Sequence, residues 1–121
     1  MRKTTRTVMS ALMRGDSCTA NNTSTDGRYV YLHGNRIIDN DLIGFTLAGY
    51  NTVTTRERVN GYLAMIGSHF RVRQIKGVPY FGTDDNPKHK LICDTDWVFA
   101  GDEWRVVSPK AETDEWGLME A

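Results

Sequence analysis

Residues 21–62 read NNTSTDGRYVYLHGNRIIDNDLIGFTLAGYNTVTTRERVNGY. Within this stretch, runs of β-branched and aromatic residues are interrupted by two short polar pairs, Gly34-Asn35 and Asn40-Asp41. Apolar runs separated by such turn residues are typical of antiparallel hairpins. The stretch therefore predicts a three-stranded meander, with strands at 28–33, around 37–38 and at 42–47.

The first strand of the meander should have two different faces. Successive side chains of a strand point to opposite sides, so Tyr29, Tyr31 and His33 share one face. Val30 and Leu32 share the other face. We expect the aliphatic face to lie in the core and the tyrosine and histidine face to be partly exposed.

A central helix is predicted directly after the meander. Thr54 and Glu57 have the spacing of a capping box, in which each side chain bonds the other residue's backbone N–H. Apolar residues then recur at helical spacing until Gly67, so the helix should cover about residues 55–66. Arg56 and Arg58 fall in its first turn, where cations are disfavoured. We therefore expect both arginines to have partners elsewhere.

Further elements are expected on both sides of this block. Apolar residues at helical spacing predict an N-terminal helix at 4–14, ended by Gly15, and the polar residues 15–27 indicate a loop. After the central helix, a hairpin is predicted at 70–75 and 78–81 around Lys76-Gly77, in which Pro79 should confine its strand to an edge or an end. Short strands are expected at 91–93, 97–100 and 103–107.

The length of 121 residues suits a single α+β domain. We divide it into the N-terminal helix (1–14), an α+β core (28–107) and an acidic tail (109–121). The 15 basic and 15 acidic side chains give a net charge of zero, which argues against a general polyanion-binding protein. The charges are nevertheless polarised, since residues 1–36 hold six bases and two acids, and residues 94–121 hold two bases and eight acids. This asymmetry indicates either an interaction tail or two solvated ends that attract each other.

Metal, cofactor and catalytic motifs are not evident. The possible zinc ligands, namely Cys18, Cys93, His33, His69 and His89, lack finger or ribbon spacing, and both cysteines are expected to be free thiols. Asp84, Asp85, Asp94 and Asp96 resemble the carboxylates of a magnesium-dependent nuclease. However, Arg105 stands where such a site usually has lysine, and aspartates are common in turns. We therefore expect no catalytic residue, no metal and no cofactor, with a nuclease as the most distant hypothesis.

Nucleic-acid binding is the chemistry for which the sequence offers most residues. Arginines and aromatic rings occur together on predicted strands, and this combination holds single-stranded bases by stacking and phosphate contacts. The candidate residues are Arg28, Tyr31, Arg71, Arg73 and Tyr80. The alternative is that these rings fill the core and the arginines are solvated, and the zero net charge favours that interpretation.

The segments NTSTDG, YLHGN and LAGYNTVTTRERVN, all within residues 22–60, resemble a family of small tailed-bacteriophage proteins. Tyr50 stands where that family commonly has tryptophan, and Val59 where it commonly has leucine. The resemblance covers about a third of the chain and carries no catalytic residues across. It implies an accessory phage protein made in the cytoplasm of the infected bacterial host.

The leading hypothesis is therefore a non-enzymatic phage protein that binds a host macromolecule, most plausibly a host protein of a defence or nucleic-acid-processing system. The expected contact residues are His33, Asn35, Arg56 and Arg58, with the acidic tail as a second surface. A single-stranded nucleic-acid binder is the alternative. The short, broken apolar run near the N-terminus lacks a cleavage site, and no stretch approaches the ~20 apolar residues of a membrane span, so no membrane association is expected.

Overall fold

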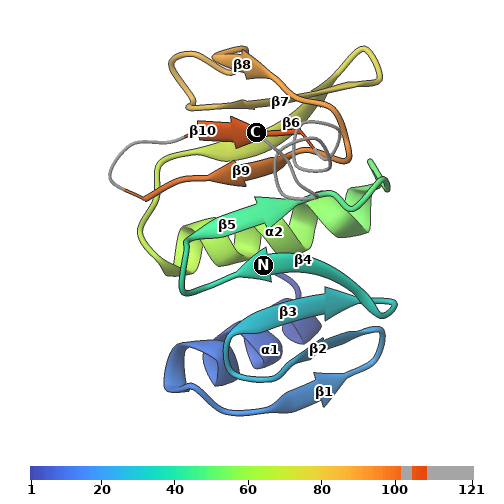
Figure 1. Ribbon diagram of the computed structural model, residues 1–121, viewed down its shortest axis with the longest axis vertical. Helices are drawn as coiled ribbons and strands as arrows, with labels where there is room; N and C mark the ends of the chain where they lie inside the picture. Colours follow the sequence, from blue (N-terminus) through green and yellow to red (C-terminus); the bar gives the residue numbers. More distant parts are fainter. Residues whose placement is uncertain (102–104, 109–121) are drawn as a thin grey trace, which may run out of the picture.

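The computed structural model describes residues 1–101 and 105–108, which form two helices and ten strands (Figure 1). The chain has the predicted α+β class, with a helix near the N-terminus and a second helix near its middle. The elements are α1 (Lys3–Arg14), β1 (Cys18–Ala20), β2 (Thr23–Thr25), β3 (Tyr29–Leu32), β4 (Asn35–Asp39), β5 (Gly44–Thr46), α2 (Val53–Met65), β6 (Arg71–Ile75), β7 (Val78–Gly82), β8 (Lys90–Leu91), β9 (Trp97–Phe99) and β10 (Arg105–Val107).

The strands form two antiparallel sheets. One has seven strands in the order β1-β2-β3-β4-β5-β9-β10, and the other has three in the order β6-β7-β8. The predicted meander is β3, β4 and β5, which pair in sequence. Its first turn is shifted by one residue from the prediction, because His33 (φ 50°) and Gly34 (φ 79°) occupy the two left-handed positions. Asn35 already pairs with Leu32, as a two-residue turn with both φ positive requires.

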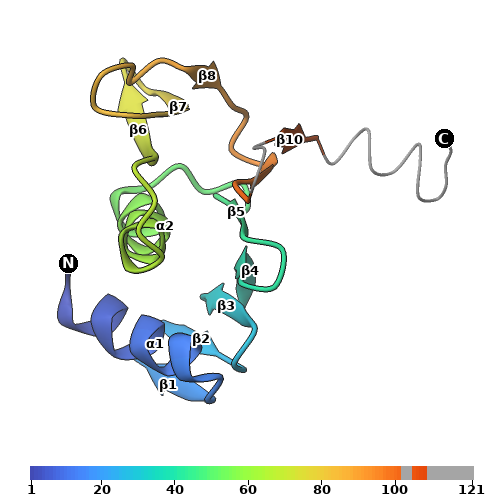
Figure 2. The same cartoon turned by 90° about the vertical axis from the view of Figure 1, so that its left-hand side faces the viewer.

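Both helices lie on the same side of the seven-stranded sheet, and the core lies between them and the sheet (Figure 2). Val30 and Leu32 of β3 face this core, with exposed fractions of 0% and 6%, as predicted. Tyr29 and Tyr31 are half-buried on the opposite face. Within the described parts of the chain no helix covers that opposite face. The other fully buried members of the core come from both helices and both sheets: Val8, Met9, Ile37, Ile38, Phe45, Val59, Tyr62, Leu63, Phe81 and Val98.

The loop predicted at residues 15–27 is wrong, because most of it is the β1–β2 hairpin. Its side chains are short and polar, yet Thr23 and Thr25 have exposed fractions of 0% and 5%. The Thr25 hydroxyl donates to the backbone oxygen of Tyr29 at 2.7 Å. A β-branched threonine whose hydroxyl has a partner fits a buried strand, so polarity alone was a misleading signal here.

The predicted capping box of α2 is also wrong. The helix begins at Val53, two residues earlier than predicted, and Thr52 is the N-cap residue. The Thr52 hydroxyl accepts from the backbone N–H of Thr55 at 3.1 Å. Thr54 therefore lies inside the first turn, and the Glu57 side chain is directed to α1 instead. The end of the helix near Gly67 and the end of α1 at Gly15 are as predicted, with both glycines at positive φ.

The three-stranded sheet contains the predicted hairpin around Lys76 and Gly77, both at positive φ. However, β7 is the central strand of this sheet and not an edge strand. Pro79 is tolerated because it lies opposite Ile92, where β8 has already ended; β8 itself pairs only with Tyr80 and Phe81. The Pro79 carbonyl accepts from the Ile92 N–H at 3.2 Å.

Three predictions for the C-terminal part have mixed results. The strand expected at 91–93 is the shorter β8, and the strand expected at 97–100 is β9. The last strand was expected at 103–107, and β10 covers its described part. The acidic tail at 109–121 lies outside the described residues. Neither of the two helices is long and apolar enough to cross a membrane.

Candidate functional site

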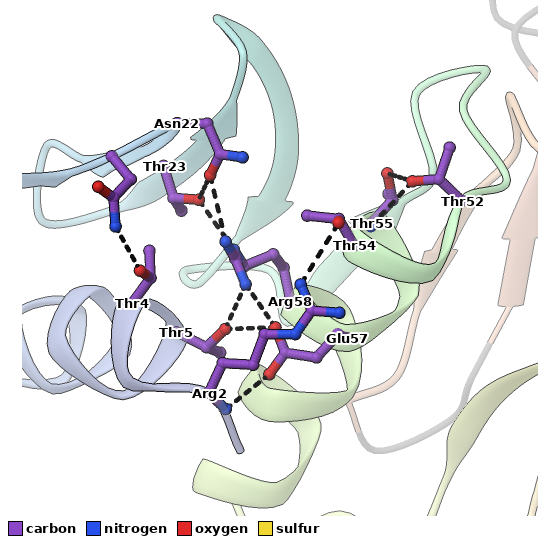
Figure 3. A network of polar contacts seen from close by, with 11 residues as sticks. Arg2, Thr4, Thr5, Asn22, Thr23, Thr52, Thr54, Thr55, Glu57 and Arg58 are labelled. Carbon is purple, nitrogen blue, oxygen red and sulfur yellow. Dashed lines mark hydrogen bonds and ion pairs between the residues drawn. The ribbon is translucent and has the colours of Figure 1, made fainter.

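A buried polar cluster around Arg58 joins three parts of the chain (Figure 3). Arg58 has an exposed fraction of only 4%. Its Nε donates to the Thr23 hydroxyl on β2 at 2.8 Å, and its Nη1 donates to the Thr5 hydroxyl on α1 at 2.8 Å. Its Nη2 donates to the Asn22 side-chain oxygen at 3.1 Å. Arg58 therefore ties α2 to α1 and to the β1–β2 hairpin.

Glu57 supplies the negative charge of this cluster. Its Oε1 lies 2.5 Å from Arg58 Nη1 and accepts from the Thr5 hydroxyl, while its Oε2 accepts from the backbone N–H of Arg2 at 3.1 Å. Burial raises the pKa of the Glu57 carboxyl, but the hydrogen bonds from Thr5, Arg2 and Arg58 together hold this pKa below its usual value. The carboxylate is therefore ionised and fixed at the contact between the two helices.

The position of Arg58 corrects the predicted contact surface. Both arginines have partners elsewhere, as expected, but only Arg56 remains accessible. Arg56 is half-buried at the start of α2, and its guanidinium donates to the side-chain oxygens of Asn51 and Gln74. Arg58 is enclosed by its own chain and presents almost no surface. We therefore exclude Arg58 from any contact surface.

His33 and Asn35 line a cleft between the β3–β4 turn and the start of α2. We call it the His33 cleft. Its volume is about 480 Å³, within the ~300–1,000 Å³ usual for ligand pockets. Its lining residues are Leu32, His33, Asn35, Ile37, Leu47, Ala48, Tyr50, Thr52, Thr54 and Thr55. The floor is thus aliphatic and the rim carries hydroxyl, amide and imidazole groups.

Local backbone geometry holds the His33 cleft open. His33 adopts φ 50°, and its N–H donates to the Asn22 carbonyl at 2.8 Å, which anchors the β3–β4 turn to the β1–β2 turn. On the other side, Tyr50 has an exposed fraction of 55%. The sequence pointed to His33 and Asn35, but it did not indicate that Tyr50 and the threonines of α2 would lie opposite them.

The side of the seven-stranded sheet that no described helix covers is a second candidate surface, which we call the outer sheet face. The register places on it Tyr29 and Tyr31 of β3, Arg36 of β4, Gly44 and Thr46 of β5, Trp97 and Phe99 of β9, and Arg105 of β10. A shallow hollow of about 550 Å³ lies between Arg36 and Trp97. Only Tyr31 of these residues was among the predicted nucleic-acid contacts.

The predicted nucleic-acid residues do not form one surface. Arg28 is paired with Asp39 at 3.1 Å and with Asp41 at 3.3 Å, beside Tyr31 on the seven-stranded sheet. The remaining three, Arg71, Arg73 and Tyr80, lie on the three-stranded sheet toward the other end of the molecule (Figure 1). There Arg71 donates to the backbone oxygens of residues 68 and 70, and Arg73 is paired with Asp84.

Two of the four aspartates considered for a nuclease, Asp84 and Asp96, have carboxylates with structural partners. The Asp96 carboxylate accepts from the Cys93 N–H at 2.8 Å, and the Asp94 carbonyl accepts from the Gly49 N–H at 2.8 Å. They lie in a turn before β9 and not on one strand face. In the described part of the chain, no group of three or more His, Cys, Asp or Glu side chains could hold a metal ion. Cys18 and Cys93 are both free thiols.

Two antiparallel sheets, a pair of helices on one side and two candidate surfaces thus define a small α+β protein. Residues 1–105 match the family model described as Kyanoviridae Gp96 protein, and the chain belongs to this family of tailed-phage proteins. The match supports the phage family suggested by residues 22–60 and extends it over most of the chain. No curated protein and no solved structure matches the chain.

Proposed function

We propose that this protein is a phage accessory protein that binds a host protein in the cytoplasm of the infected bacterium. The observation that carries the proposal is the His33 cleft, in which an aliphatic floor is surrounded by hydrogen-bonding groups. Membership in a phage family supports action inside an infected cell. In this proposal the protein catalyses no reaction, and its effect follows from occupying its partner's surface.

The chemistry of the cleft defines the kind of partner segment. Leu32, Ile37 and Leu47 are buried beneath the cleft, so they favour an apolar side chain inserted from the partner. His33 and Asn35 at the rim offer hydrogen bonds to the partner's backbone on either side of that side chain. Tyr50 is exposed, and tyrosine is enriched among the residues that dominate binding energy at interfaces.

The test uses the full chain and a matched control. His33→Asn keeps a residue that tolerates positive φ, and Tyr50→Ala removes the ring beside the cleft. Leu42→Ala is the control, because Leu42 is equally exposed, at 54% against 55%, and does not line the cleft. Tagged wild-type protein is first used to capture partners from nuclease-treated host lysate, and the captured protein is then purified and titrated against each variant.

We expect the double variant His33→Asn, Tyr50→Ala to bind the purified partner at least about tenfold more weakly than wild type. Leu42→Ala should bind as wild type does. Equal binding by all variants would remove the cleft from the contact surface. Failure of nuclease-treated lysate to yield any host protein would refute the protein-binding function itself.

A further inference from the structure

We propose that the outer sheet face binds single-stranded nucleic acid, with about three nucleotides laid across its strands. This surface is separate from the host-protein function proposed for the His33 cleft and does not depend on it. The inference rests on the arrangement of aromatic rings, on the cations beside them, and on the dimensions of the face.

Trp97 and Phe99 form an aromatic platform on β9, and both rings are half-buried. Their rings are nearly parallel, with an interplanar angle of 15° and centroids 6.0 Å apart. Gly44 on the neighbouring strand explains why the Phe99 ring can lie against β5, since a Cβ at Gly44 would approach Phe99 Cε1 to 2.6 Å. The Arg105 guanidinium carbon lies 5.1 Å from the Phe99 ring centre, and unpaired bases stack on such aromatic rings and guanidinium planes.

A second platform on β3 and β4 combines rings with a cation. The Arg36 guanidinium carbon lies 3.7 Å from the Tyr29 ring centre, and Arg36 Nη2 donates to the Tyr31 hydroxyl at 3.3 Å. The rings thus hold the guanidinium in place while Arg36 stays exposed. Bases stack on guanidinium planes as well as on aromatic rings, and the same cation can contact a phosphate.

The charges of this face favour an anionic partner. Arg36 and Arg105 have no carboxylate within ion-pair distance among residues 1–101 and 105–108. Asp39 and Asp41 at its β3–β4 side are both paired with Arg28, and Asp26 lies near enough to Arg36 to interact with its charge. Moreover, these residues hold fourteen of the 15 basic but only nine of the 15 acidic side chains. The described part of the chain therefore carries an excess of five basic side chains.

The dimensions of the face suit a short single strand. Neighbouring strands lie about 4.8 Å apart, so the four steps from β3 through β4, β5 and β9 to β10 span roughly 19 Å. Sheet platforms of this kind stack two or three bases. Exposed Thr95 lines the hollow between Arg36 and Trp97, and its hydroxyl can bond a base edge placed between the two platforms. A duplex would hide its base faces from these rings, which favours single strands.

The test measures fluorescence anisotropy of labelled ten-nucleotide single-stranded DNA and RNA, with a duplex of the same sequence for comparison. The full chain should bind the single strands at low salt and the duplex at least about tenfold more weakly. Two phosphate-contacting cations predict a slope of about −1.4 in a plot of log affinity against log salt concentration. No anisotropy change with any single strand at low salt would overturn the proposal.

Single substitutions test whether the oligonucleotide binds at the outer sheet face. Arg36→Gln and Phe99→Leu should each weaken binding about fivefold or more, whereas Arg73→Gln on the other sheet should not. Gly44→Ala is a second route, because it displaces the Phe99 ring without removing an aromatic residue. Circular dichroism establishes that each variant is folded. Binding lost in Arg73→Gln but kept in the folded Arg36 and Phe99 variants would refute the assignment.

The host-protein proposal and the nucleic-acid proposal can be refuted independently of each other. The cleft variant His33→Asn, Tyr50→Ala should bind oligonucleotides as wild type does. If the Phe99→Leu variant loses a nuclease-resistant host protein while wild type binds no oligonucleotide, the outer sheet face is a protein interface and the nucleic-acid inference is wrong.

Discussion

Arg58→Ala should destabilise the protein strongly, although arginine on a helix is usually a surface residue. The substitution removes hydrogen bonds to Thr5, Thr23 and Asn22 together with the ion pair to Glu57. It also leaves the Glu57 carboxylate, which is only 19% exposed, without its cation. Three separate chain segments lose their common partner at once.

The magnitude follows from the burial of the pair. Removing one member of a buried ion pair costs about 3–5 kcal/mol, because the other charge stays desolvated. Partial hydration of Glu57 places the expected loss of unfolding free energy near the lower end, at about 3 kcal/mol. With a urea m-value of roughly 1.5 kcal/mol/M, the unfolding midpoint should fall by about 2 M.

The assay is urea unfolding followed by far-ultraviolet circular dichroism, with Arg56→Ala as the matched control. Arg56 lies two positions away on the same helix, but it is half-exposed and bonds only neutral amides. Its removal should cost at most about 1 kcal/mol. Equal midpoints for the two variants would refute the structural role of Arg58. A large difference would also mean that charge reversal at Arg58 tests folding and not partner binding.

Three further predictions concern pH and packing. Because the pKa of Glu57 is held below its usual value, its stabilising contribution is present above pH 4.5 and is lost as pH falls through the folded-state pKa. Glu57→Gln should therefore flatten the acid side of a plot of unfolding free energy against pH, and an unchanged slope would contradict this. Burial raises the pKa of Tyr62, so the free energy of unfolding should fall as pH rises above 10. Tyr62→Phe should abolish that fall and cost about 1 kcal/mol at pH 7, since the hydroxyl donates to Asn40 at 2.9 Å. Gly82→Ala should lower the free energy of unfolding by about 2 kcal/mol, because the added Cβ would collide with the Asn86 backbone oxygen. Gly101→Ala is the control and should be nearly neutral, since a Cβ there would meet no described atom within 4 Å. Equal thermal unfolding midpoints for the two variants would contradict the collision.

Local signals in the sequence predicted the local parts of the fold. Gly15 and Gly67 adopt positive φ, which ends each of the two helices. Lys76 and Gly77 form a two-residue turn through their own positive φ angles, which depend little on tertiary contacts. The β1–β2 hairpin was missed because its serine and threonine residues are also typical of loops. Burial of Thr23 depends on Arg58, which is 35 positions away, and no short-range pattern contains that information.

The site residues likewise divide into those that local sequence patterns could place and those that depend on contacts between distant segments. Arg58 was expected to contact a partner because cations are disfavoured in the first turn of a helix, yet it lies three residues after buried Thr55 and four before buried Tyr62. This helical spacing placed it on the inward face, so the periodicity was the better guide. By contrast, the outer sheet face needs β9 beside β5, a pairing between strands that are distant in the chain. Alternation in Trp97-Val98-Phe99 indicated two rings on one face, but not which strand they would adjoin.

The placement of β9 between β5 and β10 has a consequence for synthesis of the chain. Gly44 of β5 pairs with Phe99 of β9, so β5 cannot pair on this edge until about 55 further residues have been synthesised. At about 5–20 residues per second, a ribosome exposes the bare edge of β5 for roughly 3–11 seconds. Unpaired edges recruit strands from other chains, so fragments ending before Trp97 should aggregate where the full chain does not. Expression boundaries for this protein should therefore always include β9.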